Sequence, residues 1–248
     1  NRYAKKFKKN KEAEKIFVKE GGWKEGDILI QKDLAKSLSL ISKNGSRAFY
    51  DGDITKKILK DFKENEGIFI KEDFLNYEIR KLEPLCGSYK SYQICSMPPP
   101  SSGGVAIIQM LNILENFDIK NYSHGSLEYI NLLKNIMSFA YADRSIFLGD
   151  PDYFNIPIEK LVSKDYAKKI AEKIKNKETT KIQPGMLMKE SDETTHFSII
   201  DKWGNSVSNT YTLNGAYGSG IVVKDTGILM NNEMDDFSQK PGYPNFYG

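Results

Sequence analysis

The chain has 248 residues, of which 40% are hydrophobic and 28% charged, as in an ordinary globular protein rather than a disordered or membrane-embedded one. Its 36 basic and 33 acidic side chains are well mixed and leave a net charge of +3, which gives no reason to expect a nucleic-acid partner. No apolar run approaches the roughly 18 residues that a transmembrane helix needs. A basic cluster at residues 2–11 indicates a solvated face or a frayed end, with an anionic partner as the alternative.

The first third of the chain predicts two amphipathic helices. Residues 1–26 are polar and contain glycines, which favours an edge or loop segment, and residues 27–31 form a short strand candidate. One helix is expected from Asp33 to Asn44-Gly45, and a second follows it. The apolar positions at helical spacing are Leu34, Leu38 and Ile41 in the first helix, and Ile54, Ile58, Leu59 and Phe62 in the second.

Residues 77–97 predict a hairpin, with its break at Gly87-Ser88. The two cysteines, Cys86 and Cys95, flank this break, so a disulfide is possible on geometry, although the sequence alone does not decide it. There is no CxxC or HExxH pattern, and the only histidines are His124 and His196. A histidine-rich metal site is therefore not expected. We also expect no cofactor.

The segment 97–104 combines prolines, serines and glycines, which favour an extended entry, a helix cap and a close backbone approach. Two interpretations stay open for it, a rigid helix entry and a wall of a substrate cleft, and we favour the first. The helix that follows carries apolar residues from 105 to 114. A second helix over residues 127–147 is apolar enough to be largely buried, and a third spans 163–177.

The composition changes at residues 176–193, which are polar, contain glycine and proline and lack periodicity. Such a stretch is typical of an exposed connection that proteases cut readily. Beyond it, residues 195–201 and 206–213 alternate around a turn and predict a hairpin, and residues 218–223 and 227–230 predict two shorter strands. The chain therefore changes from helices to strands across this connection.

Thr194 opens the strand region directly after the polar connection. Its β-branched side chain suits a strand edge, and this is one interpretation of the residue. The other is an N-terminal nucleophile, because cleavage of the preceding peptide bond would place the hydroxyl and a free α-amine on one residue. That amine, with an ordinary pKa of about 7.7–8.0, could accept the hydroxyl proton.

Motifs on both sides of Thr194 favour the second interpretation. Before it, segments 97–104, 112–117, 140–144 and 148–151 resemble the large subunit of γ-glutamyltranspeptidases. The start of the small subunit in that family is similar to the run from Thr194 to Asp201, to Asp201-Lys202-Trp203-Gly204-Asn205, to Thr210-Tyr211-Thr212-Leu213-Asn214, to Asn231-Asn232-Glu233-Met234-Asp235-Asp236-Phe237-Ser238 and to residues 240–248. The resemblance covers about residue 27 to the last residue, and several motifs in the right order make it specific.

This resemblance implies an α+β protein with the four-layer αββα N-terminal-nucleophile hydrolase fold, of which the chain would carry the central part. Residues 1–193 would be the C-terminal part of the large subunit, mostly helical and ending in the flexible connection 176–193. Residues 194–248 would be the N-terminal part of the small subunit, which pairs with the large one after self-cleavage of a common precursor. The family implies a periplasmic or extracellular location, although the sequence shows no signal peptide.

The implied activity is γ-glutamyl transfer from, and hydrolysis of, γ-glutamyl amides such as glutathione, with water, an amino acid or a peptide as acceptor. Self-cleavage before Thr194 would first free its amine. Thr194 would then attack the γ-carbonyl carbon and form an acyl-enzyme. Thr212, in the return strand of the hairpin, would orient the nucleophile through a hydrogen bond and help to bind the substrate.

The resemblance also implies the substrate-binding residues. Asn214 can donate to and accept from the glutamyl group. Glu233 and Asp236, rather than Asp235, would hold its α-ammonium through charge-assisted hydrogen bonds. Tyr247 is a candidate gate in a lid over the site.

Further expectations concern His196 and the parts of the family's site that these residues lack. His196 lies on the same face as Thr194, but the α-amine already supplies a base, so we interpret His196 as structural. The carboxylate-binding arginine and the oxyanion hole that the family implies are not among these residues, so the chain alone is not expected to be a complete enzyme.

Two alternatives to γ-glutamyl transfer stay open: a related acylase, of the cephalosporin or poly-γ-glutamate type, and a non-catalytic remnant. Glu233 and Asp236 favour γ-glutamyl transfer over the acylase because they suit a free α-ammonium on the donor.

Overall fold

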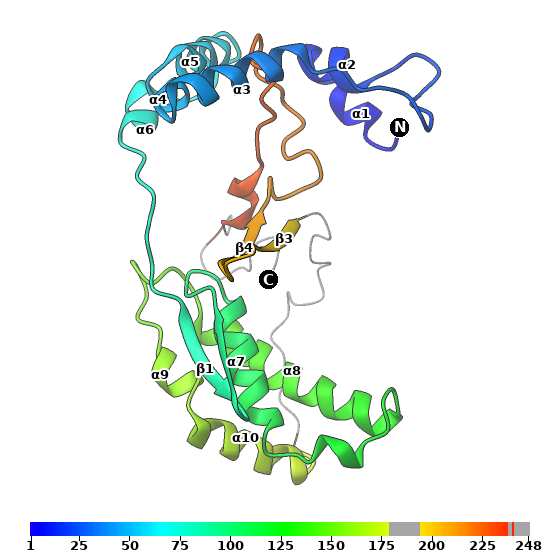
Figure 1. Cartoon of the computed structure of the whole chain (residues 1–248), viewed down its shortest axis with the longest axis vertical. Helices are drawn as coiled ribbons and strands as arrows, with labels where there is room; N and C mark the ends of the chain where they lie inside the picture. Colours follow the sequence, from blue (N-terminus) through cyan, green and yellow to red (C-terminus); the bar gives the residue numbers. More distant parts are fainter. Residues whose placement is uncertain (179–193, 238–239, 241–248) are drawn as a thin grey trace. The chain divides into compact units, whose positions relative to one another are not determined.

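The computed structural model describes residues 1–178, 194–237 and 240, and the chain divides into two compact units (Figure 1). One, here the site unit, combines Asn1–Ile79 with Lys189–Phe246. The other, the helical unit, is Arg80–Met188 together with Tyr247–Gly248. The site unit thus contains chain from both sides of the predicted subunit boundary before Thr194, and that boundary stays a prediction.

The helical unit is built around α7, which packs against the β1–β2 hairpin, α8, α9 and α10 (Figure 1). The three long helices that the sequence predicts here are confirmed. Its elements are β1 (Leu85–Tyr89), β2 (Tyr92–Ser96), α7 (Gly103–Leu114), η1 (Ile119–Asn121), α8 (Leu127–Phe147), α9 (Ile158–Leu161) and α10 (Lys164–Lys175). Apolar side chains of α7, α8 and α10 form one core cluster of Ile113, Leu132, Ile136, Ala167, Ile170, Ala171 and Ile174.

The β1–β2 hairpin is shorter than predicted and turns at residues 90–91, so the expected break at Gly87-Ser88 was wrong. Gly87 lies inside β1, where a Cβ would come within 2.6 Å of Ile108 Cγ2, so this glycine serves close packing against α7. Cys86 and Cys95 oppose each other in the register and form a disulfide, which settles the question that the sequence left open.

The proline-rich segment 97–104 leads into α7 and packs tightly against its first turn. A Cβ on Gly104 would lie 2.1 Å from the carbonyl oxygen of Met97, so only glycine allows the first turn of the helix to approach the incoming chain. Arg144 Nε donates to Ser102 Oγ at 3.1 Å and ties the end of α8 to this entry. These contacts support the interpretation of the segment as a rigid helix entry.

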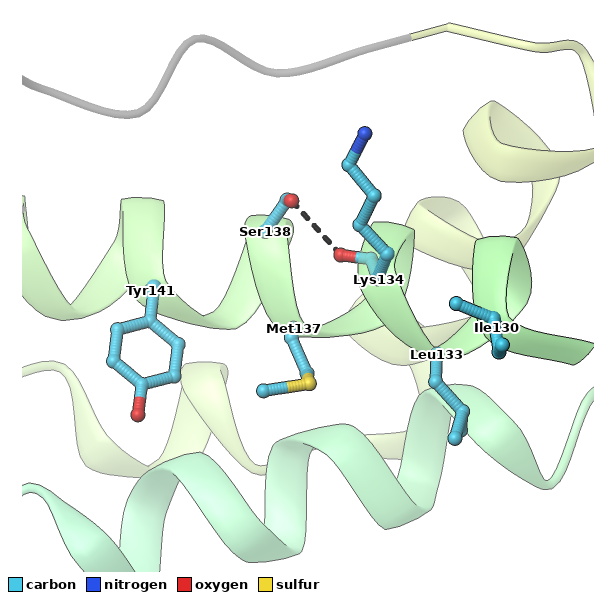
Figure 2. A pocket seen from close by; sticks show the side chains of 6 residues that line it. All are labelled: Ile130, Leu133, Lys134, Met137, Ser138 and Tyr141. Carbon is cyan, nitrogen blue, oxygen red and sulfur yellow. Dashed lines mark hydrogen bonds between the residues drawn. The ribbon is translucent and has the colours of Figure 1, made fainter. Parts of the chain in front are cut away.

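Helix α8 is less buried than predicted. Ile136 and Ala140 are inaccessible, whereas Ile130 is 54% and Met137 48% exposed. Figure 2 shows these two side chains along α8 with Leu133, where they line an apolar pocket of about 460 Å³. The described residues therefore cover one face of α8. No helix in the described part of the chain combines the length and the apolar character that crossing a membrane requires.

The site unit opens with short helices where the sequence predicts a loop. Asn10 caps α2 by accepting from Ala13 N at 2.8 Å, and Phe7 and Ala13 are buried against Val222. The loop prediction was wrong for residues 4–7 and 11–17, because these helices are stabilised by chain more than 200 residues away, whereas residues 18–26 form no helix or strand. The helices are α1 (Ala4–Phe7), α2 (Lys11–Phe17), α3 (Lys32–Asn44), α4 (Arg47–Tyr50), α5 (Asp53–Glu64) and α6 (Lys71–Leu75), of which α3 and α5 were predicted.

The predictions of three strands in this unit were wrong. Residues 27–31 form no strand, and the segments 218–223 and 227–230 are reduced to a single bridge between Val222 and Leu229. Gly227, with a φ of 68°, lets this turn approach α3, because a Cβ there would lie 2.4 Å from Leu34 N. The turn is therefore shaped by the helix beside it rather than by a sheet.

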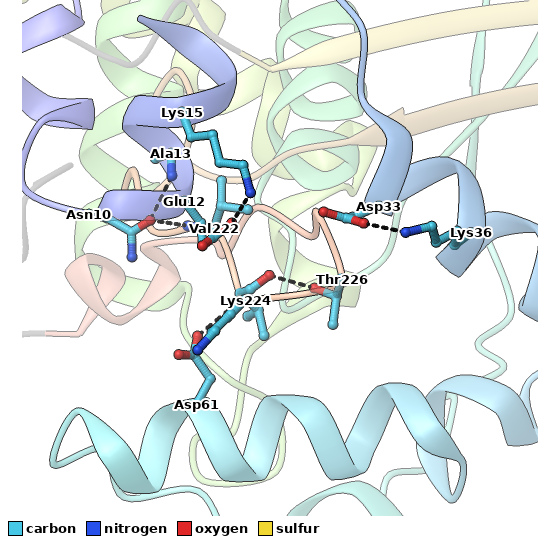
Figure 3. Close-up of polar contacts among 11 residues, drawn as sticks. Asn10, Glu12, Ala13, Lys15, Asp33, Lys36, Asp61, Val222, Lys224 and Thr226 are labelled. Atoms are coloured by element: carbon cyan, nitrogen blue, oxygen red, sulfur yellow. Dashed lines mark hydrogen bonds and ion pairs between the residues drawn. The ribbon is translucent and has the colours of Figure 1, made fainter.

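The segment 222–226 nevertheless holds the site unit together. Val222 packs with residues of α1 and α2, and Val223 with Ile54 and Ile58 of α5. Figure 3 shows the polar contacts around it: Val222 N donates to Asn10 Oδ1 at 3.3 Å, and Lys224 N to Asp61 Oδ2 at 3.0 Å. Chain that follows residue 194 is thus packed between helices that precede it.

Candidate active site

The hairpin after residue 194 brings two threonines together. β3 (Thr195–Ile200) pairs antiparallel with β4 (Ser206–Tyr211), as predicted. Thr194 directly precedes β3 and Thr212 directly follows β4, so strand alternation points both side chains to one face. Thr194 Oγ1 donates a hydrogen bond of 3.2 Å to Thr212 Oγ1. The predicted nucleophile therefore lies next to the hydroxyl expected to orient it, and their catalytic roles stay predictions.

Thr212 is held in turn by the loop that follows β4. Its Oγ1 also accepts from the backbone N of Asn214 at 2.9 Å, so two donors fix this oxygen. Asn214 has a φ of 71°, a region that asparagine adopts more readily than most residues, and it is only 6% exposed. Its Nδ2 donates to the carbonyl oxygen of Asn232 at 3.0 Å. Asn214 thus braces the loop, and its contact with a glutamyl group stays a prediction.

The acidic residues lie in a short 3-10 turn, η2 (Glu233–Asp236). Burial, a hydrogen bond with Asp236 and the negative charge of Asp236 raise the pKa of the Glu233 carboxyl above its ordinary value. Two adjacent carboxyl groups of this kind form an attractive site for a cation. Asp235 is engaged differently, because its Oδ2 accepts from Asn232 Nδ2 at 2.6 Å. The binding of an ammonium group by Glu233 and Asp236 stays a prediction.

His196 lies opposite Thr210 in the register, on the face that Thr194 shares. Its Nδ1 lies 2.7 Å from Thr210 Oγ1, and its Nε2 lies 3.1 Å from Ser208 Oγ and 3.4 Å from Ser198 Oγ. Both ring nitrogens therefore have hydroxyl partners within the hairpin. This network supports the interpretation of His196 as a structural residue that joins the two strands.

Two parts of the predicted site lie outside the described residues. They are Tyr247, the candidate gate, and Glu193, which forms the peptide bond to Thr194. Within the described ranges, no group of three or more His, Cys, Asp and Glu side chains could hold a metal ion.

Asn232 is a residue of the site to which the sequence interpretation gave no role. It hydrogen-bonds both to the loop after β4 and to η2, through its backbone and its side chain. The sequence signal for it is slight: an asparagine pair directly before the acidic motif.

Comparisons with known proteins agree with this geometry. A sequence model described as gamma-glutamyltranspeptidase matches residues 1–248. The glutathione hydrolase proenzyme of Escherichia coli K12 is 50% identical over 238 residues, which are 94% of this chain and 41% of that protein. The chain thus spans well under half the length of this curated relative.

Solved structures that are similar to the chain include the following two. The crystal structure of Helicobacter pylori gamma-glutamyltranspeptidase is 41% identical with a TM-score of 0.69, over 77% of this chain and 57% of that one. Cephalosporin acylase from Bacillus halodurans is 25% identical with a TM-score of 0.75, over 92% of this chain and 41% of that one. The α+β class and the partial N-terminal-nucleophile hydrolase fold are confirmed by these neighbours. With its whole length matched by the family's sequence model, the chain belongs to the γ-glutamyltranspeptidase family.

Proposed function

We propose that the protein cleaves itself before Thr194 and then transfers γ-glutamyl groups, from glutathione or similar amides, to water or to an amino acid or peptide. The observation that carries this proposal is the 3.2 Å hydrogen bond between the hydroxyls of Thr194 and Thr212 at the open end of the β3–β4 hairpin. A hydroxyl held in one direction on a strand is a stiff mount for a nucleophile. The curated relative's designation as a glutathione hydrolase proenzyme supports both the substrate and the precursor.

The proposed reaction needs no base other than the new N-terminus. The free α-amine of Thr194 takes the proton of its hydroxyl, and Oγ1 forms a bond to the γ-carbonyl carbon of the donor. The amide C–N bond then breaks, and the leaving amine takes the proton from the α-ammonium of Thr194. Water or an acceptor amine then attacks the threonyl ester and gives a proton to the α-amine. The ester C–O bond breaks, the γ-glutamyl product leaves, and the proton returns to Thr194 Oγ1.

Donor selection is proposed to rest on η2. The carboxyl groups of Glu233 and Asp236 are adjacent, and a charge-assisted hydrogen bond to an α-ammonium contributes about 1.5–3 kcal/mol. A γ-glutamyl amide carries that ammonium, whereas a glutaryl amide is the same donor without it. The two donors therefore form a matched pair for testing the site.

The likeness to a cephalosporin acylase makes an acylase the second candidate. The test compares hydrolysis of γ-glutamyl-p-nitroanilide and glutaryl-p-nitroanilide by the full-length protein and by its Asp236→Ala variant. We expect the wild type to prefer the γ-glutamyl donor and Asp236→Ala to lose that preference. A preference for the glutaryl donor would favour the acylase, and no turnover of either donor would favour the non-catalytic remnant.

A further inference from the structure

Asn232 is bonded to the loop that follows the nucleophile hairpin. Its backbone N donates to Leu213 O at 3.1 Å, and its backbone O accepts from Asn214 Nδ2 at 3.0 Å. Its side-chain Oδ1 accepts from Gly215 N at 2.9 Å. A Cβ on Gly215 would lie 3.3 Å from that oxygen, so the glycine leaves room for this contact. Three hydrogen bonds thus attach Asn232 to the residues that come directly after Thr212.

The same residue is bonded to the acidic turn. Its Nδ2 donates to Asp235 Oδ2 at 2.6 Å, and its backbone O accepts from Asp235 N at 3.1 Å. The carboxylate of Asp235 is thereby turned toward Asn232. The side-chain amide uses its oxygen toward Gly215 and its nitrogen toward Asp235, so its two ends join two separate segments.

Asparagine is the residue type that this position requires. An aspartate would keep the acceptor for Gly215 N but would replace the donor by a negative charge beside Asp235. An alanine would leave Gly215 N and the Asp235 carboxylate without this partner. The dependence on both ends of the amide distinguishes Asn232 from a residue that merely fills space.

We propose that Asn232 is a positioning residue that sets donor specificity, by holding the Glu233–Asp236 turn at a fixed place relative to Thr212. This inference rests on the proposed function, since it assumes that the turn receives the donor's α-ammonium. Asn232 acts through Asp235 and the loop, and the carboxyl groups of Glu233 and Asp236 make the contact with the donor. The turn and the nucleophile must fit one substrate. A small displacement of the turn therefore lowers turnover of the α-amino donor more than turnover of a donor that lacks the amine.

The readout is the ratio of kcat/KM for γ-glutamyl-p-nitroanilide to kcat/KM for glutaryl-p-nitroanilide, measured on full-length protein. Asn232→Ala should reduce this ratio roughly tenfold or more, the effect of a weakened charge-assisted hydrogen bond. Asn205→Ala is the matched control, because Asn205 Nδ2 donates to Asp201 Oδ2 at 2.8 Å in the turn between β3 and β4. It removes the same kind of amide–carboxylate bond away from the loop and should leave the ratio unchanged.

A paired exchange guards against a variant that only unfolds. N232D should lower the ratio of the two kcat/KM values. N232D/D235N should restore most of the wild-type ratio, because the amide donor and the carboxylate acceptor then exchange places. Asn232→Ala in the Asp236→Ala background should change the ratio little, since the carboxylate that it positions is already gone. An equal fall for both donors in Asn232→Ala, or no recovery in N232D/D235N, would overturn the inference.

Failure of the inference and failure of the proposed function give different results. If the wild type prefers the γ-glutamyl donor and Asp236→Ala abolishes that preference, while Asn232→Ala keeps it, only the role of Asn232 is wrong. If the wild type shows no preference for the α-amino donor, the proposed donor site itself is wrong and the role of Asn232 falls with it.

Discussion

The helical unit and the β3–β4 hairpin differ in the burial and the polarity of their side chains. In the helical unit, α7, α8 and α10 each direct an apolar face into a shared core, where Ile113 and Ile136 are almost inaccessible. In the hairpin, every residue of β3 and β4 is exposed within the described chain, and one face carries hydroxyls, an imidazole and the Thr194–Thr212 pair. Packing accounts for the apolar pattern of the helical unit, whereas the proposed reaction accounts for the polar face of the hairpin. Substitutions in the two regions should therefore affect different measurements.

Ile113→Ala should have the largest effect on stability. Ile113 is fully buried, so the substitution removes apolar contacts and leaves a cavity that costs about 2–5 kcal/mol. Urea unfolding of the full-length protein, followed by circular dichroism, measures this loss. Ile107→Ala, at a half-exposed position of the same helix, is the control and should cost much less. Slower self-cleavage of the folded Ile113→Ala protein would contradict the separation of the two regions.

Tyr166→Phe tests the polar contact between α8 and α10. Tyr166 OH donates to Asp143 at 2.9 Å, and burial together with the Asp143 charge raises the pKa of Tyr166 to about 12. At neutral pH the loss of this bond should cost about 1.5–3 kcal/mol of unfolding free energy. The raised pKa means that the bond stabilises the folded state fully below about pH 10, and progressively less from about pH 10 to about pH 12.

The stability difference between wild type and Tyr166→Phe should therefore shrink across that pH range, as measured by urea unfolding at fixed pH values. A difference that stays constant to pH 12 would show that the hydroxyl does not titrate in this environment. Turnover at neutral pH should remain at the wild-type level, because neither Asp143 nor Tyr166 is among the predicted site residues.

Thr212→Val should reverse the pattern, lowering activity with little loss of stability. The substitution keeps the shape of an exposed side chain but removes the oxygen that accepts from Thr194 Oγ1 and Asn214 N. We expect kcat to fall about 10- to 100-fold, which corresponds to about 1.4–2.7 kcal/mol in the barrier. Thr195→Val, on the other face of the hairpin, is the control. Equal losses of activity in both variants would mean that the face does not matter.

Glu233→Gln should have the smallest effect, a modest rise in KM at neutral pH together with a loss of the pH dependence on the acid side. The raised pKa of Glu233 means that this carboxyl group takes up a proton before an ordinary glutamate does as pH falls. Affinity for the α-ammonium donor should then decrease with falling pH, and KM should rise by a few-fold. Glu233→Gln should flatten this rise while keeping a hydrogen-bonding partner. An unchanged acid-side KM profile in Glu233→Gln would exclude Glu233 as the titrating group.

The sequence predicted the parts of the fold whose signals are local. The helices at 103–114 and 127–147 follow from apolar periodicity, and the β3–β4 hairpin follows from alternation around a turn. The short helices at residues 4–17 were missed because Val222, far along the chain, buries their apolar side chains. The position of the β1–β2 turn was missed because Gly87 is required by contact with Ile108, and a contact of this kind has no local signature.

The candidate site was predicted from its motifs, but the connections between them were not. The resemblance singled out Thr194, Thr212 and the acidic turn as separate segments. That Thr212 and Asn214 are linked through Asn232 to this turn depends on contacts across 17 and 18 residues. Such contacts form only when the loop folds back on itself, so residue types and spacing gave no indication of them.

Self-cleavage before Thr194 would show that the exposed hairpin begins with a reactive hydroxyl, and the mass of the purified full-length protein measures it. The hydroxyl of Thr194 is expected to attack the carbonyl of Glu193, so the wild type should separate under denaturing conditions into two pieces whose second one begins with Thr194. Thr194→Ala should remain a single chain of full mass. A wild-type protein that stays intact, or a Thr194→Ala variant that still splits between residues 193 and 194, would exclude Thr194 as the nucleophile of self-cleavage.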